Sequence, residues 1–260
     1  MTPVGQSKGH QRVTIVRAFI FSRLVETSEM NRRLFIGTLA AGGVGAAAGC
    51  LSSFVDDATT FTAAPARVSE EAVREAGYEY QGTEKRVDED RMGGEDVEVT
   101  SYASLYDRTI DLPAEYSEEP VRAGVFGVAT TPQVTVGDES FNPVGDLSDG
   151  ELAAHVQNRY DGLEIGRSVG GRAVESLGEQ FSLTSYEGTA TLRDDFELDV
   201  LVDVAQPDHD GDHLVIAAVY PADDLVPDES EQERIDALVA DLNHYDGLDV
   251  EIVERSGDEG

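Results

Sequence analysis

The stretch VRAGVFGVA, from Val121 to Ala129, is an almost continuous apolar run with one charged residue near its start. A strand that is buried on both faces has this composition, so we predict a central strand of a sheet here. The segments at residues 78–87 and 97–110 alternate apolar and polar side chains around Gly93-Gly94, which predicts a β-hairpin. Residues 131–136 are expected to extend the sheet beyond Pro132.

More strands are predicted after the central one. Turn residues occur at Gly170-Gly171, at Gly178, at Asp194-Asp195 and across residues 208–212. They separate strand candidates at residues 164–169, 173–177, 181–193 and 196–205, which are followed by 214–220 and a short last strand at 248–253. Strands joined by tight turns predict a largely antiparallel sheet.

Three segments carry helix-start signals. These are an N-cap at Ser69 with Gly77 as the stop, a capping box at Ser148 and Glu151, and a second capping box at Ser230 and Glu233. The apolar stripe of the last helix consists of Ile235, Leu238, Val239, Leu242 and Tyr245. We therefore predict an α+β fold, a largely antiparallel sheet with about three helices packed on it, in an order similar to the Mog1/PsbP-like sandwich.

A different signal precedes the predicted domain. Arg32 and Arg33 lead into an uncharged run at residues 34–49, which ends at Cys50, the only cysteine of the chain. This arrangement resembles a twin-arginine export signal with a lipobox, in which the cysteine receives lipid. The run is shorter than the roughly 20 residues that a membrane-spanning helix needs. The alternative is an uncleaved N-terminal anchor with an incidental buried cysteine.

These signals divide the chain into five parts. We interpret them as a mis-assigned extension at 1–29, a signal peptide at 30–49, a tether at 50–62, a single α+β domain at 63–254 and a tail at 255–260. Translation would then begin at Met30, directly before the arginine pair. A genuine long segment ahead of the arginines is the alternative.

The chain is strongly acidic, with 52 acidic and 19 basic residues and a formal net charge of −33. Such charge repels itself in dilute buffer, whereas molar salt shortens the screening length to about 3 Å. We therefore infer a halophilic archaeon as the source, with an intrinsically disordered acidic chain as the rival interpretation. The charge makes nucleic acid an improbable partner. The lone cysteine excludes an internal disulfide.

No catalytic motif and no cofactor site is predicted, because the sequence has neither a Gly-x-Ser-x-Gly elbow nor a phosphate-binding glycine loop. The local cluster that deserves testing is DHDGDH, residues 208–213. Its alternate carboxylates could hold Ca²⁺, and His209 with His213 would favour a transition metal. We expect a solvated hairpin turn instead of a metal site. His155 and His244 are expected to be helix-flank residues.

Short motifs spread over residues 50–250 resemble a family of haloarchaeal twin-arginine lipoproteins of unknown function. They are FTAAPARVS at 61–69, AGYE at 76–79, TPQV at 131–134, FNPV at 141–144 and VYP at 219–221. The resemblance implies an address and a class of protein, but no activity.

The sequence therefore predicts a lipid-anchored protein on the extracellular face of the cytoplasmic membrane. Its expected partners are the membrane, through lipid on Cys50, and the twin-arginine export machinery, through Arg32 and Arg33. A non-enzymatic protein that binds a partner or small ligand is the first hypothesis. An exported hydrolase or metal-dependent enzyme with dispersed acidic residues is the alternative.

Overall fold

The computed structural model describes residues 60–92, 95–110, 120–136, 139–141, 145, 147–191, 197–222 and 230–253. Arg32, Arg33 and Cys50 lie outside these ranges, as do the predicted turn at Asp194-Asp195 and most of the FNPV motif. The predictions that concern them therefore remain predictions.

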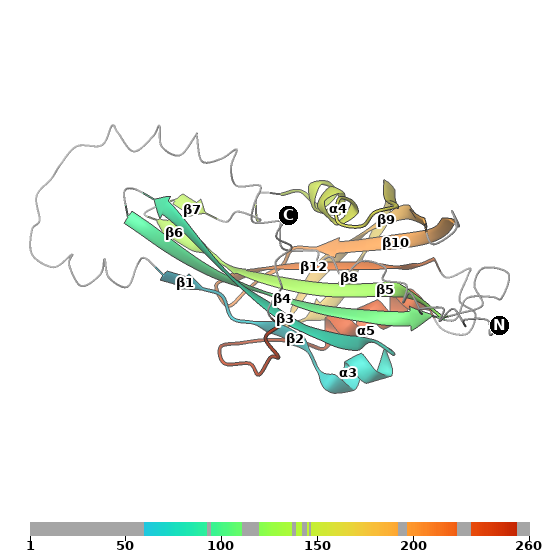
Figure 1. Cartoon of the computed structure of the whole chain (residues 1–260), viewed down its shortest axis with the longest axis horizontal. Coiled ribbons are helices and arrows are strands. Elements are labelled where there is room, and N and C mark those ends of the chain that lie inside the picture. The colour runs from blue at the N-terminus through green and yellow to red at the C-terminus, as the bar shows by residue number, and fades with distance from the viewer. Residues whose placement is uncertain are drawn as a thin grey trace, which may run out of the picture.

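The body of the domain is one sheet of nine strands with the order β1-β4-β5-β12-β10-β9-β8, in which β3 also pairs with β4 and β11 with β12 (Figure 1). Its strands are β1 (Thr60–Thr62), β3 (Glu79–Met92), β4 (Glu95–Ile110), β5 (Val121–Pro132), β8 (Leu163–Ser176), β9 (Glu179–Thr191), β10 (Glu197–Ala205), β11 (Asp208–His209) and β12 (Asp212–Pro221). Two small sheets pair β2 (Ala66–Val68) with β13 (Leu242–His244) and β6 (Val134–Val136) with β7 (Glu139–Phe141). The large sheet is mixed, because β1 pairs with β4 in parallel while its other pairs are antiparallel.

The described helices are α3 (Glu70–Glu75), α4 (Asp149–Gln157) and α5 (Glu231–Ala240). The longest helix, α5, is only about 15 Å long. The sheet, measured across the seven neighbouring strands from β1 to β8, is roughly 29 Å wide. The prediction of an α+β fold with helices packed on a sheet, and with it the Mog1/PsbP-like sandwich, is therefore wrong. The fold is β-rich, because strands contain most of the described residues and the helices cover only part of the sheet.

The strand predictions around the apolar stretch are largely confirmed. The hairpin at Gly93-Gly94 is β3–β4, and β5 lies between β4 and β12. Residues 134–136 do not extend β5, because they pair with β7 in a separate sheet. Of the predicted last strand, only Ile252 makes a bridge, to Thr83.

The predicted turn at Gly170-Gly171 is wrong. Strand β8 continues through both glycines and keeps its pairing with β9, with register shifts just before them. Gly170 has φ +146 and no neighbour within 4 Å of an added Cβ, so it lies in an irregular, open part of an edge strand. Glycine marks a bulge here, as it often does inside strands, and the chain reverses only at Leu177-Gly178.

The helix starts follow from local chemistry and are confirmed. Ser69, Ser148 and Ser230 each accept a hydrogen bond from a first-turn backbone N–H, and Ser148 with Glu151 forms the complete capping box. The apolar stripe of α5 is shorter than predicted. The helix ends at Ala240, and Tyr245 is 52% exposed.

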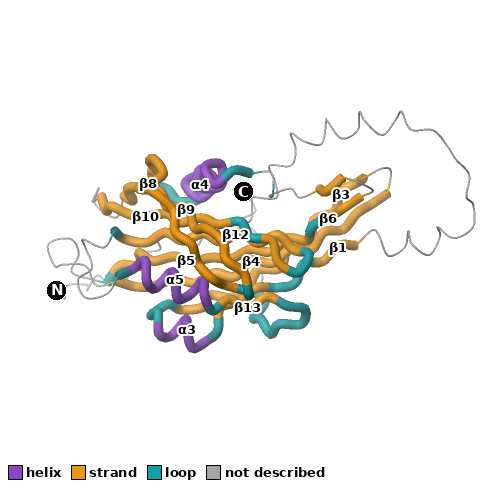
Figure 2. Tube along the Cα trace, turned by 180° about the vertical axis from the view of Figure 1, so that it is seen from behind, coloured by secondary structure: helices purple, strands orange, loops and turns teal. Residues whose placement is uncertain are grey.

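The two faces of the sheet carry separate cores, and every residue of β12 is buried. One face of β12 contributes Leu214, Ile216, Ala218 and Tyr220 to the core that includes α3 and α5, and the other contributes Val215, Ala217 and Val219 to the core that includes α4. Figure 1 and the reverse view in Figure 2 show α4 on one side of the sheet and α3 and α5 on the other. Among the described helices, none has the length and apolarity to cross a membrane.

Candidate functional site

The predicted hairpin at residues 208–213 is confirmed and joins β11 to β12, but it is not solvated throughout, because Asp212 and His213 are buried. Asp210 and Gly211 occupy the turn with φ values of +49 and +85, the left-handed conformation that Asp and Gly tolerate best. The register pairs Asp208 with His213 and His209 with Asp212. Since opposite residues share a face, this hairpin places one His–Asp pair on each side of the sheet.

The pair on the α5 side is joined by a third side chain. His244, from β13, has its Nε2 3.1 Å from Asp212 Oδ2 and its Nδ1 2.8 Å from His209 Nδ1. The same Asp212 oxygen accepts the backbone N–H of Ala64 at 2.6 Å. We call His209, Asp212 and His244 the histidine cluster. It connects the segment after β1, the β11–β12 hairpin and the segment after α5.

The direction of these hydrogen bonds follows from which groups can donate and which can only accept. A carboxylate only accepts, so His244 donates its Nε2–H to Asp212. A neutral His244 then presents a lone pair at Nδ1, directed at His209. The two histidines differ in their exposure to solvent, because the His244 side chain is fully buried while the His209 side chain is 18% exposed. The cluster therefore reaches solvent through His209.

The role of His244 was not predicted. The sequence suggested a helix flank, whereas α5 ends at Ala240 and Leu242–His244 forms a strand that pairs with β2. Leu242 and His244 are buried and Asn243 between them is exposed, so the strand alternates. This three-residue alternation was the only local signal, and it is too short to outweigh the preceding helical pattern.

The pair on the α4 side is simpler. His213 Nδ1 lies 2.7 Å from Asp208 Oδ1, while its Nε2 is buried without a hydrogen-bond partner. Thr131 is opposite His213 on β5, and its hydroxyl is also buried without a partner. An Asp–His pair beside a hydroxyl resembles the order of a nucleophilic triad. However, Thr131 is only 4% exposed, so a substrate would have to displace the strand to reach it.

The three carboxylates of the predicted Ca²⁺ alternative do not converge. Asp208 and Asp212 lie on opposite sides of the sheet, and Asp210 is 74% exposed at the turn. Within the part of the chain that the structure describes, no group of three or more His, Cys, Asp or Glu side chains is assembled around a metal position. His155 lies near the end of α4, half-buried, as expected for a helix flank.

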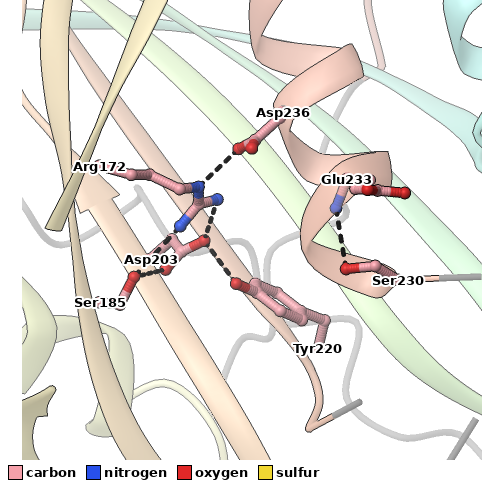
Figure 3. Close-up of polar contacts among 7 residues, drawn as sticks. All are labelled: Arg172, Ser185, Asp203, Tyr220, Ser230, Glu233 and Asp236. Atoms are coloured by element: carbon pink, nitrogen blue, oxygen red, sulfur yellow. Dashed lines mark hydrogen bonds and ion pairs between the residues drawn. The ribbon is translucent and has the colours of Figure 1, made fainter. Parts of the chain in front are cut away.

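A second polar cluster lies under α5, and Figure 3 shows it. Its members are Arg172 of β8, Ser185 of β9, Asp203 of β10, Tyr220 of β12 and Asp236 of α5, which we call the arginine cluster. Arg172 contacts Asp203 Oδ2 and Asp236 Oδ1, both at 2.7 Å. Asp203, fully buried, also accepts from Ser185 at 2.6 Å and from Tyr220 at 2.7 Å.

The electrostatics of the arginine cluster fix its charges. Burial disfavours the charge of Arg172, but the hydrogen bond and charge of Asp203, and then the hydrogen bond to Asp236, outweigh this and raise its pKa above the ordinary value. Burial, and then the Asp203 carboxylate, raises the pKa of the Tyr220 phenol. Arg172 therefore stays charged and Tyr220 stays neutral at any ordinary pH. The arrangement suits a fixed connection between α5 and four strands better than proton transfer.

Comparison of the chain with known proteins gives a family match. Residues 65–243 match a family described as a domain of unknown function, DUF6517. The chain belongs to this family. The sequence-based prediction of an uncharacterised family is thus confirmed at that level. No protein in the curated set matches the chain.

The family match covers the arginine cluster and the β11–β12 hairpin. It begins one residue after Ala64 and ends one residue before His244, so these two contacts of Asp212 lie at the margins of the family domain. The arginine cluster therefore lies wholly inside the matched range, whereas His244, which completes the histidine cluster, lies one residue outside it.

Proposed function

We propose that this protein is exported through the twin-arginine route and held by lipid on Cys50 at the extracellular face of the cytoplasmic membrane of a halophilic archaeon. The observation that carries the proposal is the order of signals, with Arg32-Arg33, sixteen uncharged residues and the single cysteine in that order ahead of the domain. Strand β1 begins at Thr60, ten residues after Cys50. A tether of this length would keep the domain close to the membrane surface.

Outside the cell, the proposed role is to bind a ligand or partner without catalysing a reaction. Two features argue against catalysis at the other polar sites. In the arginine cluster the charged groups form ion pairs with one another. The Thr131 hydroxyl beside His213 is buried. The histidine cluster, by contrast, holds nitrogen atoms that bind ligands without covalent chemistry.

The anchor is tested by expressing the full chain and a Cys50→Ser variant in a halophilic archaeon and separating membranes from soluble fractions. We expect the wild-type protein in the membrane fraction and the variant in the soluble or secreted fraction. Ser53→Ala, three residues away, is the matched control and should behave as wild type. Membrane association of Cys50→Ser at the wild-type level would refute lipidation.

The export route is tested separately. The conservative pair Arg32→Lys and Arg33→Lys should leave the protein inside the cell with its leader uncleaved, because the route recognises the arginines themselves. An intact-mass measurement detects the leader. Normal processing of the double variant would exclude the twin-arginine route while leaving the lipid anchor open.

An exported metal-dependent hydrolase is the second candidate, favoured by the contact between His209 and His244. Purified protein with Zn²⁺ in molar KCl is assayed on chromogenic ester and phosphate substrates and on casein. Turnover that His209→Gln abolishes would replace the binding role with catalysis. Absence of turnover in wild type supports binding.

A further inference from the structure

We propose that His209 and His244 bind a transition-metal cation of the Zn²⁺ type between their Nδ1 atoms, with Asp212 as the outer partner that orients His244. The inference concerns the folded domain alone and does not depend on the export signal or the lipid. It rests on three features of the histidine cluster, which are the facing nitrogens, the fixed orientation of His244 and the supply of further ligands beside His209.

The first feature is the distance between the two nitrogens. Nδ1 of His209 and Nδ1 of His244 lie 2.8 Å apart, and the rings meet at 64° with centroids 5.1 Å apart. Two nitrogens on one tetrahedral Zn²⁺ are about 3.4 Å apart, because each Zn–N bond is near 2.0–2.1 Å. A retreat of roughly half an ångström therefore converts the contact into a two-ligand site. His209 can make that movement, because β11 is two residues long and the His209 side chain reaches solvent.

The second feature is the support behind His244. Its Nε2–H is donated to Asp212, and Asp212 is held in turn by the N–H of Ala64. Metal-binding histidines usually donate their second nitrogen to a carboxylate in this way, which fixes the tautomer and directs the free lone pair at the metal. The buried His244 is thus already oriented as a ligand.

The third feature is the supply of further ligands. Asp210 Oδ2 lies 3.8 Å from His209 Nδ1, on an exposed turn residue that can approach a bound cation. Water would complete the coordination. The two imidazoles select the class of metal, because nitrogen ligands suit Zn²⁺, Co²⁺, Ni²⁺ and Cu²⁺, whereas Ca²⁺ and Mg²⁺ prefer oxygen.

This arrangement agrees with the lack of a preassembled three-ligand centre among the described residues. Two ligands are in place and the third is an exposed carboxylate neighbour, so the expected site is open and exchangeable. The competing explanation is a simple hydrogen bond, in which His209 donates its Nδ1–H to His244. The two explanations differ in whether a cation can displace that hydrogen.

The test is calorimetric titration of the full-length protein with Zn²⁺ in molar KCl, with excess Mg²⁺ present to occupy the many surface carboxylates. We expect saturable heat for one Zn²⁺ and its loss in His209→Gln. His155→Gln is the matched control, because it removes a histidine from α4 and should leave the heat unchanged. Thermal unfolding confirms that each variant is folded.

Two further measurements identify the ligands. Asp212→Asn should weaken Zn²⁺ binding about 10–100-fold while His209 and His244 remain, as expected for an outer partner. Co²⁺ should give visible absorption bands of nitrogen coordination in wild type that are absent from His209→Gln. If wild type shows no saturable Zn²⁺ heat in excess Mg²⁺, or if His209→Gln retains it, the contact is a hydrogen bond only and the proposal is overturned.

Discussion

The two polar clusters lie at opposite ends of one buried strand. Asp212 is the first residue of β12 and Tyr220 is its ninth, so about 27 Å separates them along the same face. The arginine cluster joins groups that keep one charge state, and Asp203 accepts from three donors. The histidine cluster joins one carboxylate to two imidazoles, one of which reaches solvent. The comparison leads us to propose that the same core is fixed at one end and exchangeable at the other.

The largest effect should come from breaking the fixed end. Asp203→Ala leaves the Arg172 charge and the Tyr220 hydroxyl buried without their main partner, and we expect a loss of about 3–5 kcal/mol in the free energy of unfolding. Urea unfolding in molar KCl measures it. Asp199→Ala, an exposed residue of the same strand, is the control and should stay within about 0.5 kcal/mol of wild type. A loss below about 1 kcal/mol for Asp203→Ala would remove the distinction between the clusters.

Breaking the histidine cluster, at the exchangeable end, should reduce the free energy of unfolding by less than breaking the arginine cluster. Asp212→Ala leaves two buried donors, the Ala64 N–H and the His244 Nε2–H, without an acceptor but strands no permanent charge. We expect a loss of about 1–3 kcal/mol in the same assay. A cost equal to that of Asp203→Ala would show that the histidine cluster is also a rigid structural connection.

Alkaline pH should destabilise the folded protein, in part through Tyr220 at the fixed end. Burial raises the pKa of Tyr220 in the folded state, so between the unfolded value near 10 and the folded value only the unfolded phenol is deprotonated. Stability is then unaffected below about pH 10 and falls above it, by about 1.4 kcal/mol per pH unit for each such tyrosine. Urea midpoints at rising pH measure the slope.

Tyr220→Phe should reduce that slope by the contribution of one phenol, while Tyr78, Tyr106 and Tyr160, whose pKa values burial also raises, maintain the rest. Absorbance at 295 nm should show these phenols ionising only as the protein unfolds. Ionisation of Tyr220 in the folded protein would contradict its isolation from solvent.

The smallest effect is expected on the α4 side of the hairpin. Replacing His213 should cost little stability, because its Nε2 has no hydrogen-bond partner and its Nδ1 contacts Asp208, whose side chain is 65% exposed. His213→Leu should change the free energy of unfolding by no more than about 1 kcal/mol. His244→Leu, which removes both contacts of a buried histidine, should cost more. If His213→Leu cost more stability than His244→Leu, the more stabilising histidine would be the one on the α4 side.

The sequence allowed the local elements to be predicted where a few neighbouring residues decide them. Serine caps start the helices because their side chains reach backbone N–H groups three residues away. The β3–β4 hairpin follows from alternation around two glycines. The same reasoning failed at Gly170-Gly171, where pairing with β9 carries the strand through two residues that usually mark a turn. It also overestimated the helices, since tertiary pairing takes Leu242–His244 into a strand.

The sequence by itself determined the hairpin at residues 208–213, the central strand and the acidic character, because each depends on nearby residues or on composition. Only the tertiary structure decided which buried polar groups meet. His244 reaches His209 across 35 residues, Arg172 reaches Asp236 across 64, and Ala64 reaches Asp212 across 148. These contacts depend on strand order and register, which long-range burial sets and which no local propensity encodes.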